Sequence, residues 1–155
     1  DIIRNTLEAS PLFTMAPGET VLNARSYNEA KLNPFHLRKK MVKPEGYRLV
    51  HYKDKNFQAA FAAETGIEKT MYVTLTLTKS MATGVGKNGY CRADAAMAVM
   101  IKDSRGKTLW NKTYEVRSTD RTKVSGGAYS GDELLALFPG IITDACLDFL
   151  DDLSR

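Results

Sequence analysis

An alternation of apolar and polar residues with a period of two runs through the middle of the chain and constrains the fold most. In residues 70–81 the apolar set is Met71, Val73, Leu75 and Leu77. Residues 92–102 repeat the pattern with Ala93, Ala95, Met97, Val99 and Ile101. Such a period is typical of strands with one buried and one wetter face. With glycine-bearing turns at 84–89 and 103–106, it predicts a three-stranded antiparallel meander over residues 70–81, 92–102 and 109–118.

The segments before the meander predict two further strands and two short helices. The strands are expected at residues 20–27 and 47–52. Asn33-Pro34 is a helix start, so a short helix is expected over residues 34–42. Asn56 is expected to cap an alanine-rich helix over residues 57–65, which Gly66 closes in a left-handed conformation. Residues 1–9 predict another short helix.

The segments after the meander predict a loop and a final helix. Residues 119–129 are polar and glycine-bearing, which favours a mobile loop. Ser130 and Glu133 have the capping-box spacing that begins a helix, and Pro139-Gly140 predicts a kink or two consecutive helices. The predicted fold is therefore α/β, a single layered domain in the order β-α-β-α-β-β-β-α. A mixed sheet contains the meander, and the helices pack on it.

The length of 155 residues predicts one domain over residues 1–155. In an alternative, residues 1–19 form a loosely packed amino-terminal extension. No apolar run approaches the roughly 20 residues needed to cross a bilayer. The chain opens with Asp1 rather than Met, so we expect a trimmed or processed form that has lost any targeting segment or lipidated cysteine.

Charge is distributed unevenly along the chain. From Arg25 to Lys55 there are nine basic and three acidic residues, whereas residues 132–155 hold six acidic residues and one basic. The densest basic patch consists of Arg38, Lys39, Lys40 and Lys43. It is a candidate surface for a partner or an anion, including an anionic lipid, and the alternative is a solvated face. Nucleic acid is not expected, because no recognised nucleic-acid motif accompanies the patch.

Two cysteines, Cys91 and Cys146, fall on predicted apolar faces. Both should point into the core, where they could be neighbours. Buried thiols are expected, and the alternatives are a disulfide, which would imply an oxidising compartment, and a reactive thiolate.

No motif for catalysis, cofactor binding or metal binding is present. Residues 83–87 resemble the end of a phosphate-binding loop, but Met81 and Asn88 stand where the pattern needs glycine and Ser or Thr. His36 and His51 have no ligand partner at helical spacing and no nucleophile motif. The sequence therefore predicts no enzyme, no cofactor and no metal, with an enzyme using Cys91 or a histidine as an alternative.

The polar face of the meander is a candidate contact surface. It would present small, weakly charged side chains, among them Thr74, Thr76, Ala96 and Ala98. Such a flat face can pack on another subunit, on a helix of the same chain or on a peptide.

One part of the chain resembles a known group of domains. A short helix ends at residues 65–68, two strands follow, and residues 103–110 read Asp-Ser-Arg-Gly-Lys-Thr-Leu-Trp. This is similar to the D-x-x-G-x-x-L-W hairpin in accessory domains of bacterial envelope lipoproteins, such as the TolB amino-terminal domain, the curli-secretion lipoprotein and the activators of penicillin-binding proteins. The resemblance implies a periplasmic, non-enzymatic module without catalytic residues.

The expected function is accordingly a binding or assembly module of the bacterial cell envelope. It would be a lipoprotein ectodomain, periplasmic or anchored through a removed amino-terminal lipid segment. Its partners would be an envelope protein or a peptidoglycan-associated component, and it could form a homo-oligomer. The alternative is a carrier that holds an apolar or lipid ligand between sheet and helices, lined by Phe57, Phe61, Met97, Phe138 and Phe149.

Overall fold

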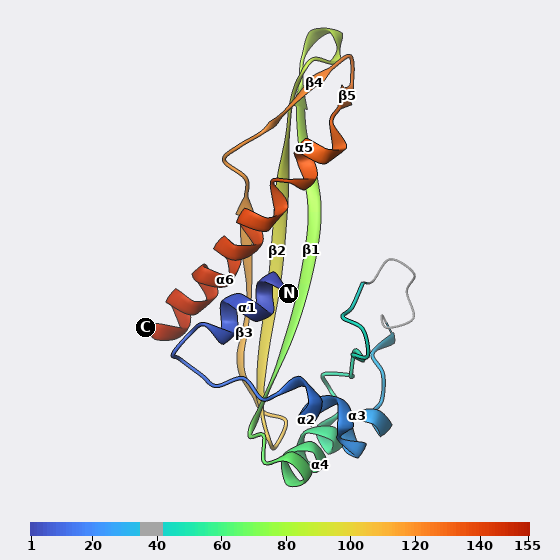
Figure 1. Ribbon diagram of the computed structural model, residues 1–155, viewed down its shortest axis with the longest axis vertical. Coiled ribbons are helices and arrows are strands. Elements are labelled where there is room, and N and C mark those ends of the chain that lie inside the picture. Colours follow the sequence, from blue (N-terminus) through green and yellow to red (C-terminus); the bar gives the residue numbers. More distant parts are fainter. Residues whose placement is uncertain (35–41) are drawn as a thin grey trace. The chain divides into compact units, whose positions relative to one another are not determined.

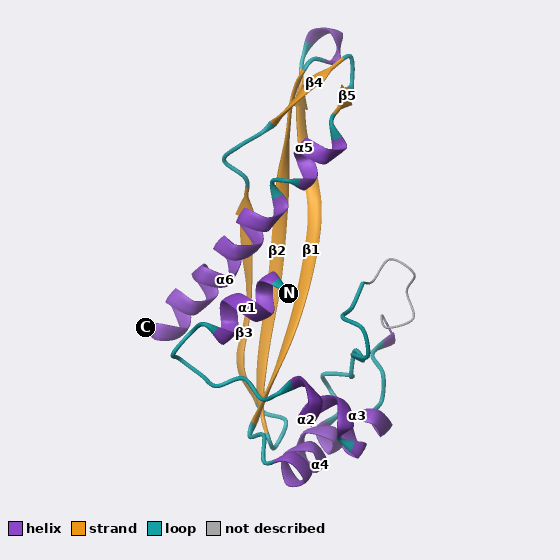
Figure 2. Ribbon diagram, viewed as in Figure 1, coloured by secondary structure: helices purple, strands orange, loops and turns teal. Residues whose placement is uncertain are grey.

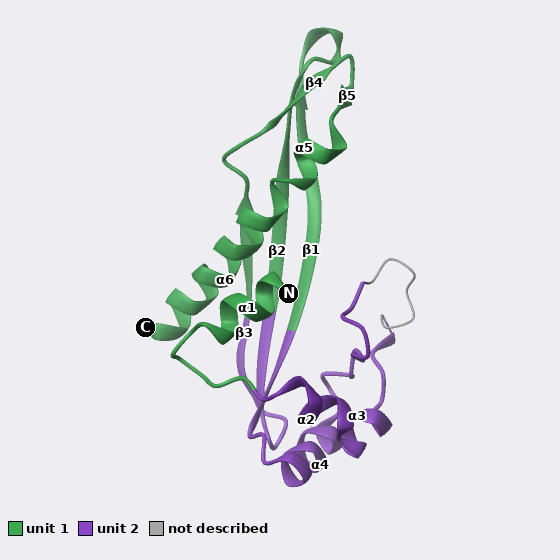
Figure 3. Cartoon of the chain, viewed as in Figure 1, with its two compact units in different colours: residues 1–15, 73–98, 112–155 green, residues 16–72, 99–111 purple. Residues whose placement is uncertain are grey.

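The computed structural model describes residues 1–34 and 42–155 (Figure 1). Helices pack on an antiparallel sheet of five strands, so the predicted α/β class is confirmed. Contacts divide the chain into two compact units (Figure 3). Unit 1 comprises residues 1–15, 73–98 and 112–155, and unit 2 comprises residues 16–72 and 99–111. The single domain expected from the length stays a prediction.

The central strand of the sheet is β2 (Gly89–Asp103), as Figure 2 shows. On one side it pairs with β1 (Lys69–Thr83), and on the other with β3 (Thr108–Arg117). The three neighbouring strands predicted from the alternation are therefore present. The two long strands β1 and β2 each have 15 residues.

A short hairpin replaces the loop that was predicted over residues 119–129. It consists of β4 (Thr122–Ser125), which pairs with the start of β2, and β5 (Ala128–Tyr129). Gly126 and Gly127, with φ of 59° and 87°, form the two-residue turn between them. The segment is ordered because Val124 is completely buried against the covered face of the sheet.

The connection between β1 and β2 is longer than a two-residue turn. A single 3₁₀ turn (η2, Val85–Lys87) forms it, and Gly89 already belongs to β2. Gly89 allows a close approach of the two strands, because a Cβ atom there would lie 1.9 Å from the carbonyl oxygen of Ala82.

Unit 1 contains three helices, one at the start of the chain and two near its end. They are α1 (Ile2–Glu8), α5 (Gly131–Leu135) and α6 (Phe138–Ser154). Ser130 caps α5 by accepting a hydrogen bond from the backbone N–H of Glu133 at 3.2 Å. The Pro139 region does divide the predicted final helix in two, since Pro139 fits the first turn of α6, where its missing N–H costs nothing. α1 packs against α6 and buries Leu7.

The core of unit 1 lies between the sheet and these helices. One cluster joins the start of β2 to β4, α5 and α6, and it consists of Cys91, Ala93, Ala95, Val124, Leu134 and Ile141. Beyond this cluster, the ring of Phe149 on α6 contacts the ring of Tyr114 on β3 edge-on, with 5.8 Å between the ring centroids. The alanines of β2 leave room for the bulkier residues of the facing helices.

In unit 2, the strand predicted over residues 20–27 is wrong. This segment forms α2 (Gly18–Asn23) and α3 (Arg25–Glu29). Val21, Ala24 and Tyr27 recur at three-residue spacing and pack into one cluster with the phenylalanines of α4. The segment therefore follows a helical period rather than the period of two that a strand would have.

The strand predicted over residues 47–52 is also wrong, because the segment makes only one isolated bridge, Leu32 to Val50. The Tyr27 hydroxyl accepts a hydrogen bond from the backbone N–H of Arg48 and donates one to its carbonyl oxygen. A side chain thus satisfies backbone groups that a neighbouring strand would otherwise pair with. Without these two early strands, the order β-α-β-α does not occur, and β4 pairs antiparallel with both β2 and β5 rather than in a mixed sheet.

Helix α4 (Lys55–Thr65) begins two residues before the predicted start, so Asn56 lies inside the helix and is not its cap. Asp54 caps it by accepting a hydrogen bond from the backbone N–H of Phe57 at 3.1 Å. Gly66 ends it in the left-handed conformation, as predicted, with φ of 73°. Most of the helix predicted over residues 34–42 lies outside the described residues.

The turn between β2 and β3 contains the aspartate and the glycine of the D-x-x-G-x-x-L-W motif at residues 103–110. The Asp103 carboxylate accepts hydrogen bonds from the backbone N–H groups of Arg105 and Lys107, both at 2.9 Å. Gly106 has φ of 78°, a conformation that favours glycine. Aspartate and glycine at this spacing therefore form a turn.

Candidate functional site

The sheet of unit 1 has one covered and one open face, and β2 shows the difference most clearly. Its odd-numbered residues from Cys91 to Met97 are buried, and its even-numbered residues from Arg92 to Ala98 are half-buried. The covered face packs on α6, where the Cys146 sulfur lies 3.7 Å from that of Met97. The even-numbered residues point the opposite way, so they form the open face.

The predicted sheet-face residues lie on this open face. Thr74 and Thr76 of β1 are exposed, and Ala96 and Ala98 of β2 are half-buried. The two strands share the face, because Ser80 of β1 hydrogen-bonds Asp94 of β2. Their role as a contact surface stays a prediction.

A shallow hollow on the open face brings several arginines of unit 1 together. Its volume is about 380 Å³ and its lining includes three arginines and no acidic residue. The lining residues are Ser80, Met81, Ala82, Tyr90, Arg92, Arg117 and Arg121. We call it the arginine hollow. The small residues of β1 and the ring of Tyr90 make its apolar floor, and the guanidinium groups supply the charge.

Two of the three arginines are held in place by neighbours. The Cζ atom of Arg121 lies 3.8 Å from the centroid of the Tyr90 ring, a cation–π contact. Arg117 donates a hydrogen bond from Nε to the Asp94 carboxylate at 2.5 Å. Burial works to raise the pKa of Asp94, but the hydrogen bonds from Arg117 and Ser80 outweigh burial and hold that pKa below its usual range.

This arrangement is suited to binding an anion. Guanidinium groups bind carboxylate and phosphate oxygens with two parallel hydrogen bonds, and they keep their charge at any physiological pH. An apolar floor beside them lets a flat or aliphatic group lie against the sheet. A carboxylate-bearing or phosphate-bearing segment therefore fits the hollow.

Sequence reasoning did not identify the arginine hollow. Arg92 and Arg117 have the outward parity of their strands, which is a signal that the sequence does contain. Their meeting with Arg121, however, depends on the register between β2 and β3 and on the path of the chain after Ser118. Ser118 fixes that path by accepting a hydrogen bond from the backbone N–H of Ala93 at 3.0 Å.

Of the predicted basic patch, Arg38, Lys39 and Lys40 lie outside the described residues, and so does His36. Lys43 is described and exposed. A second basic hollow of about 530 Å³ lies in unit 2, and its lining includes Lys31, His51, Lys53 and Lys55. Its one carboxylate, Asp54, already caps α4.

The two cysteines are buried, as predicted, and both are free thiols. They are not neighbours. Cys146 contacts Met97, which is six residues along β2 from Cys91, and a strand of that length spans ~20 Å. A disulfide needs Cα atoms within ~7 Å, so the structure does not bring the pair into bonding range. Burial raises the pKa of Cys146, which disfavours a reactive thiolate.

The residues predicted to line a carrier cavity are divided between the units. Phe57 and Phe61 are packed in the core cluster of unit 2, with ring centroids 5.2 Å apart. Met97, Phe138 and Phe149 belong to unit 1, where Met97 and Phe149 are completely buried by their neighbours. Within the described residues these side chains fill cores.

Other features of the described chain add no site. Among residues 1–34 and 42–155, no three His, Cys, Asp or Glu side chains gather as metal ligands would. In the same residues, no helix has both the length and the apolar character to cross a membrane. No family model matches the chain, and neither a curated protein nor a solved structure is significantly similar to it. The functional proposal therefore rests on the geometry of the open face.

Proposed function

We propose that this chain is a non-enzymatic binding module of the bacterial cell envelope that docks an anionic segment of another envelope component on the open face of unit 1. The observation that carries the proposal is the arginine hollow. It joins three guanidinium groups to an apolar floor, on a face whose neighbouring residues are small or exposed. Binding would depend on charge and on shape, and no bond is made or broken.

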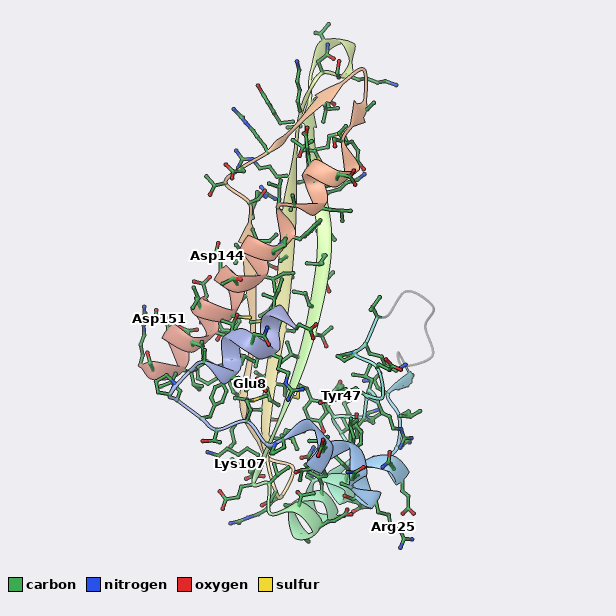
Figure 4. All side chains as sticks on the ribbon, in the orientation of Figure 1. Glu8, Arg25, Tyr47, Lys107, Asp144 and Asp151 are labelled. Carbon is green, nitrogen blue, oxygen red and sulfur yellow. The ribbon has the colours of Figure 1, made fainter. Side chains whose placement is uncertain are left out.

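The opposite side of unit 1 has the opposite charge. Asp144, Asp148 and Asp151 are exposed along α6. Figure 4 shows Asp144 and Asp151 on the side of α6 turned away from the sheet. Charges of opposite sign on the two sides of one unit orient an anionic partner toward the arginines and away from α6.

The cellular context in this proposal comes from the resemblance of residues 57–110 to accessory domains of envelope lipoproteins. In that setting the chain is a periplasmic ectodomain, tethered by a lipid-bearing segment that precedes it, and its partner is an envelope protein or a peptidoglycan-associated component. Protease treatment of intact and permeabilised spheroplasts that make the whole protein tests this part. Digestion that requires permeabilisation would contradict it.

Site-specific photo-crosslinking in living cells tests the docking face. A photoreactive amino acid at Ala96 or Ala98 probes the open face, and the same residue at Leu147 on α6, which is 51% exposed, is the matched control. We expect a discrete adduct of defined mass at the two open-face positions and none at Leu147. Adducts confined to Leu147, or equal at all three positions, would contradict the proposal.

A further inference from the structure

The free edge of β1 is the second unusual feature of unit 1. β1 pairs with β2 on one side, and within the described residues no strand pairs with its other side. Such an edge leaves a row of backbone N–H and C=O groups without strand partners. In unit 1 this edge begins at residue 73, and residues 73–78 run up to Lys79, whose ammonium group hydrogen-bonds the Tyr129 hydroxyl of β5. Six residues span ~20 Å, the length of an ordinary strand.

Side-chain exposure shows that this part of the edge is uncovered. Thr76, Leu77 and Thr78 are exposed in succession, although adjacent residues point to opposite faces of the sheet. A helix or loop lying along the edge would bury at least one of the two faces. Leu77 keeps 43% of its surface accessible on the side that the helices cover elsewhere.

The edge also lacks the features that protect edges in soluble proteins. Residues 73–78 read Val-Thr-Leu-Thr-Leu-Thr, with no proline, no charge and no glycine. The side chain of the next residue, Lys79, extends over the covered face, where its ammonium nitrogen lies 4.3 Å from the centroid of the Tyr129 ring. A long edge of β-branched and aliphatic residues without a charge is a template for another strand.

The arginine hollow indicates which strand fits. Ser80 and Ala82 of β1 belong to its floor, and both have small side chains, so a chain that leaves the edge can reach Arg92 over them. We propose that the docked segment is an extended acidic peptide: its backbone adds to residues 73–78 of β1, and carboxylates at one of its ends bind the arginine hollow. This inference rests on the proposed function and adds the partner's conformation and chemistry.

A second copy of the chain fits less well than such a peptide. Pairing of β1 with β1 of another copy would cover the edge. It would bring two lysines and no carboxylate, since residues 69–83 contain Lys69 and Lys79 as their charged residues. The arginines would remain without an anionic partner.

The test uses fluorescent peptides of alternating valine and threonine that carry two glutamates at either the amino or the carboxyl end. One companion peptide has alternate backbone N–H groups methylated, and another has lysines in place of the glutamates. We expect one of the two glutamate peptides to bind, and its methylated form to bind about tenfold or more weakly, because methylation removes the interstrand hydrogen bonds. The lysine peptide should not bind.

Two matched variants and an exchange measurement locate the peptide. Thr78→Glu should weaken binding severalfold, because the new carboxylate repels the glutamates of the peptide. Thr78→Lys lowers the strand propensity by a similar amount but should not weaken binding. Bound peptide should slow amide hydrogen exchange within residues 73–83.

The outcomes separate the inference from the proposed function. Binding that depends on the arginines, but is insensitive to methylation and leaves exchange in residues 73–83 unchanged, would overturn the added strand and leave the docking face in place. Protection of residues 73–83 in the chain alone, with a dimer in light scattering, would overturn the inference in favour of a second copy. No binding of either glutamate peptide would overturn it as well, whereas the crosslinks at Ala96 and Ala98 test the docking face separately.

Discussion

The two faces of the sheet in unit 1 are made from the same strands but from different kinds of residue. On β2, Ala93 and Ala95 are buried and pack under helices, while Arg92 and Asp94, which alternate with them, face outward and carry charge. The covered face contributes hydrophobic burial, and the open face contributes charged and small side chains. Because side chains alternate along a strand, one stretch of backbone supports both faces, and a substitution on one leaves the other almost unchanged.

This contrast predicts where substitutions change stability and where they change binding. Covered-face changes should lower the free energy of unfolding and leave anion binding intact. Open-face changes should do the reverse.

The largest expected effect is the loss of stability in Phe149→Ala. The phenyl ring is completely buried and meets Tyr114 edge-on, so its removal leaves a cavity and should lower the free energy of unfolding by about 3–5 kcal/mol. Urea unfolding followed by circular dichroism measures this loss. Leu147→Ala, on the exposed side of the same helix, is the control and should change stability by no more than about 0.5 kcal/mol.

The next effect concerns the thiol of Cys146 on the covered face. Cys146→Ser places a hydroxyl where the Met97 sulfur is the neighbour, and we expect a loss of about 1–3 kcal/mol because the hydroxyl is buried without a good partner. In the native protein neither Cys91 nor Cys146 should react with a thiol reagent, and both should react in denaturant. Rapid reaction of a native thiol would contradict the packing described for this face.

The same thiol makes stability depend on alkaline pH. Burial raises the pKa of Cys146 in the folded chain above its value of about 8.5 in the unfolded chain. Its contribution to stability is therefore complete below about pH 8.5 and is lost as the pH rises toward the folded pKa. Unfolding measured from pH 7 to 10 on the wild type and on Cys146→Ala should show a steeper fall in the wild type, and parallel curves would be the contrary result.

A smaller effect is expected for Asp94 on the open face. Its pKa is lowered in the folded chain, so its contribution is present above the unfolded value of about 3.9 and is lost as the pH falls through the lower, folded pKa. Asp94→Asn should cost less than about 1 kcal/mol at pH 7, since the ion pair with Arg117 is exposed. The difference from wild type should shrink as the pH falls below about 3.9, and a cost that does not change over this acidic range would argue against the ion pair.

The parts of the fold that the sequence predicted are those set by local signals. The alternation along β2, the Ser130–Glu133 cap and the left-handed Gly66 each depend on a few adjacent residues, and each is present in the structure. The strand predicted over residues 47–52 failed because the Tyr27 hydroxyl pairs with the backbone N–H and C=O of Arg48, a contact between residues distant in the sequence.

The site was harder to predict for a similar reason. Thr74, Thr76, Ala96 and Ala98 follow from parity alone, and the structure places them on one open face. The arginine hollow requires Arg121 to return over Tyr90 after the chain leaves β3, and no local pattern encodes that return. The lack of contact between Cys91 and Cys146 likewise depends on how far α6 runs along β2 before Cys146 reaches Met97.

The most direct test of the account compares two variants in two measurements. Phe149→Leu changes the covered face, and the double substitution Arg92→Gln with Arg121→Gln changes the open face. We predict that Phe149→Leu lowers the free energy of unfolding by about 1–3 kcal/mol and leaves the affinity for the glutamate peptide unchanged, while the arginine variant keeps its stability within about 0.5 kcal/mol and loses the peptide. Equal losses of stability and affinity in both variants, or unchanged peptide affinity in the arginine variant, would contradict the division of roles between the two faces.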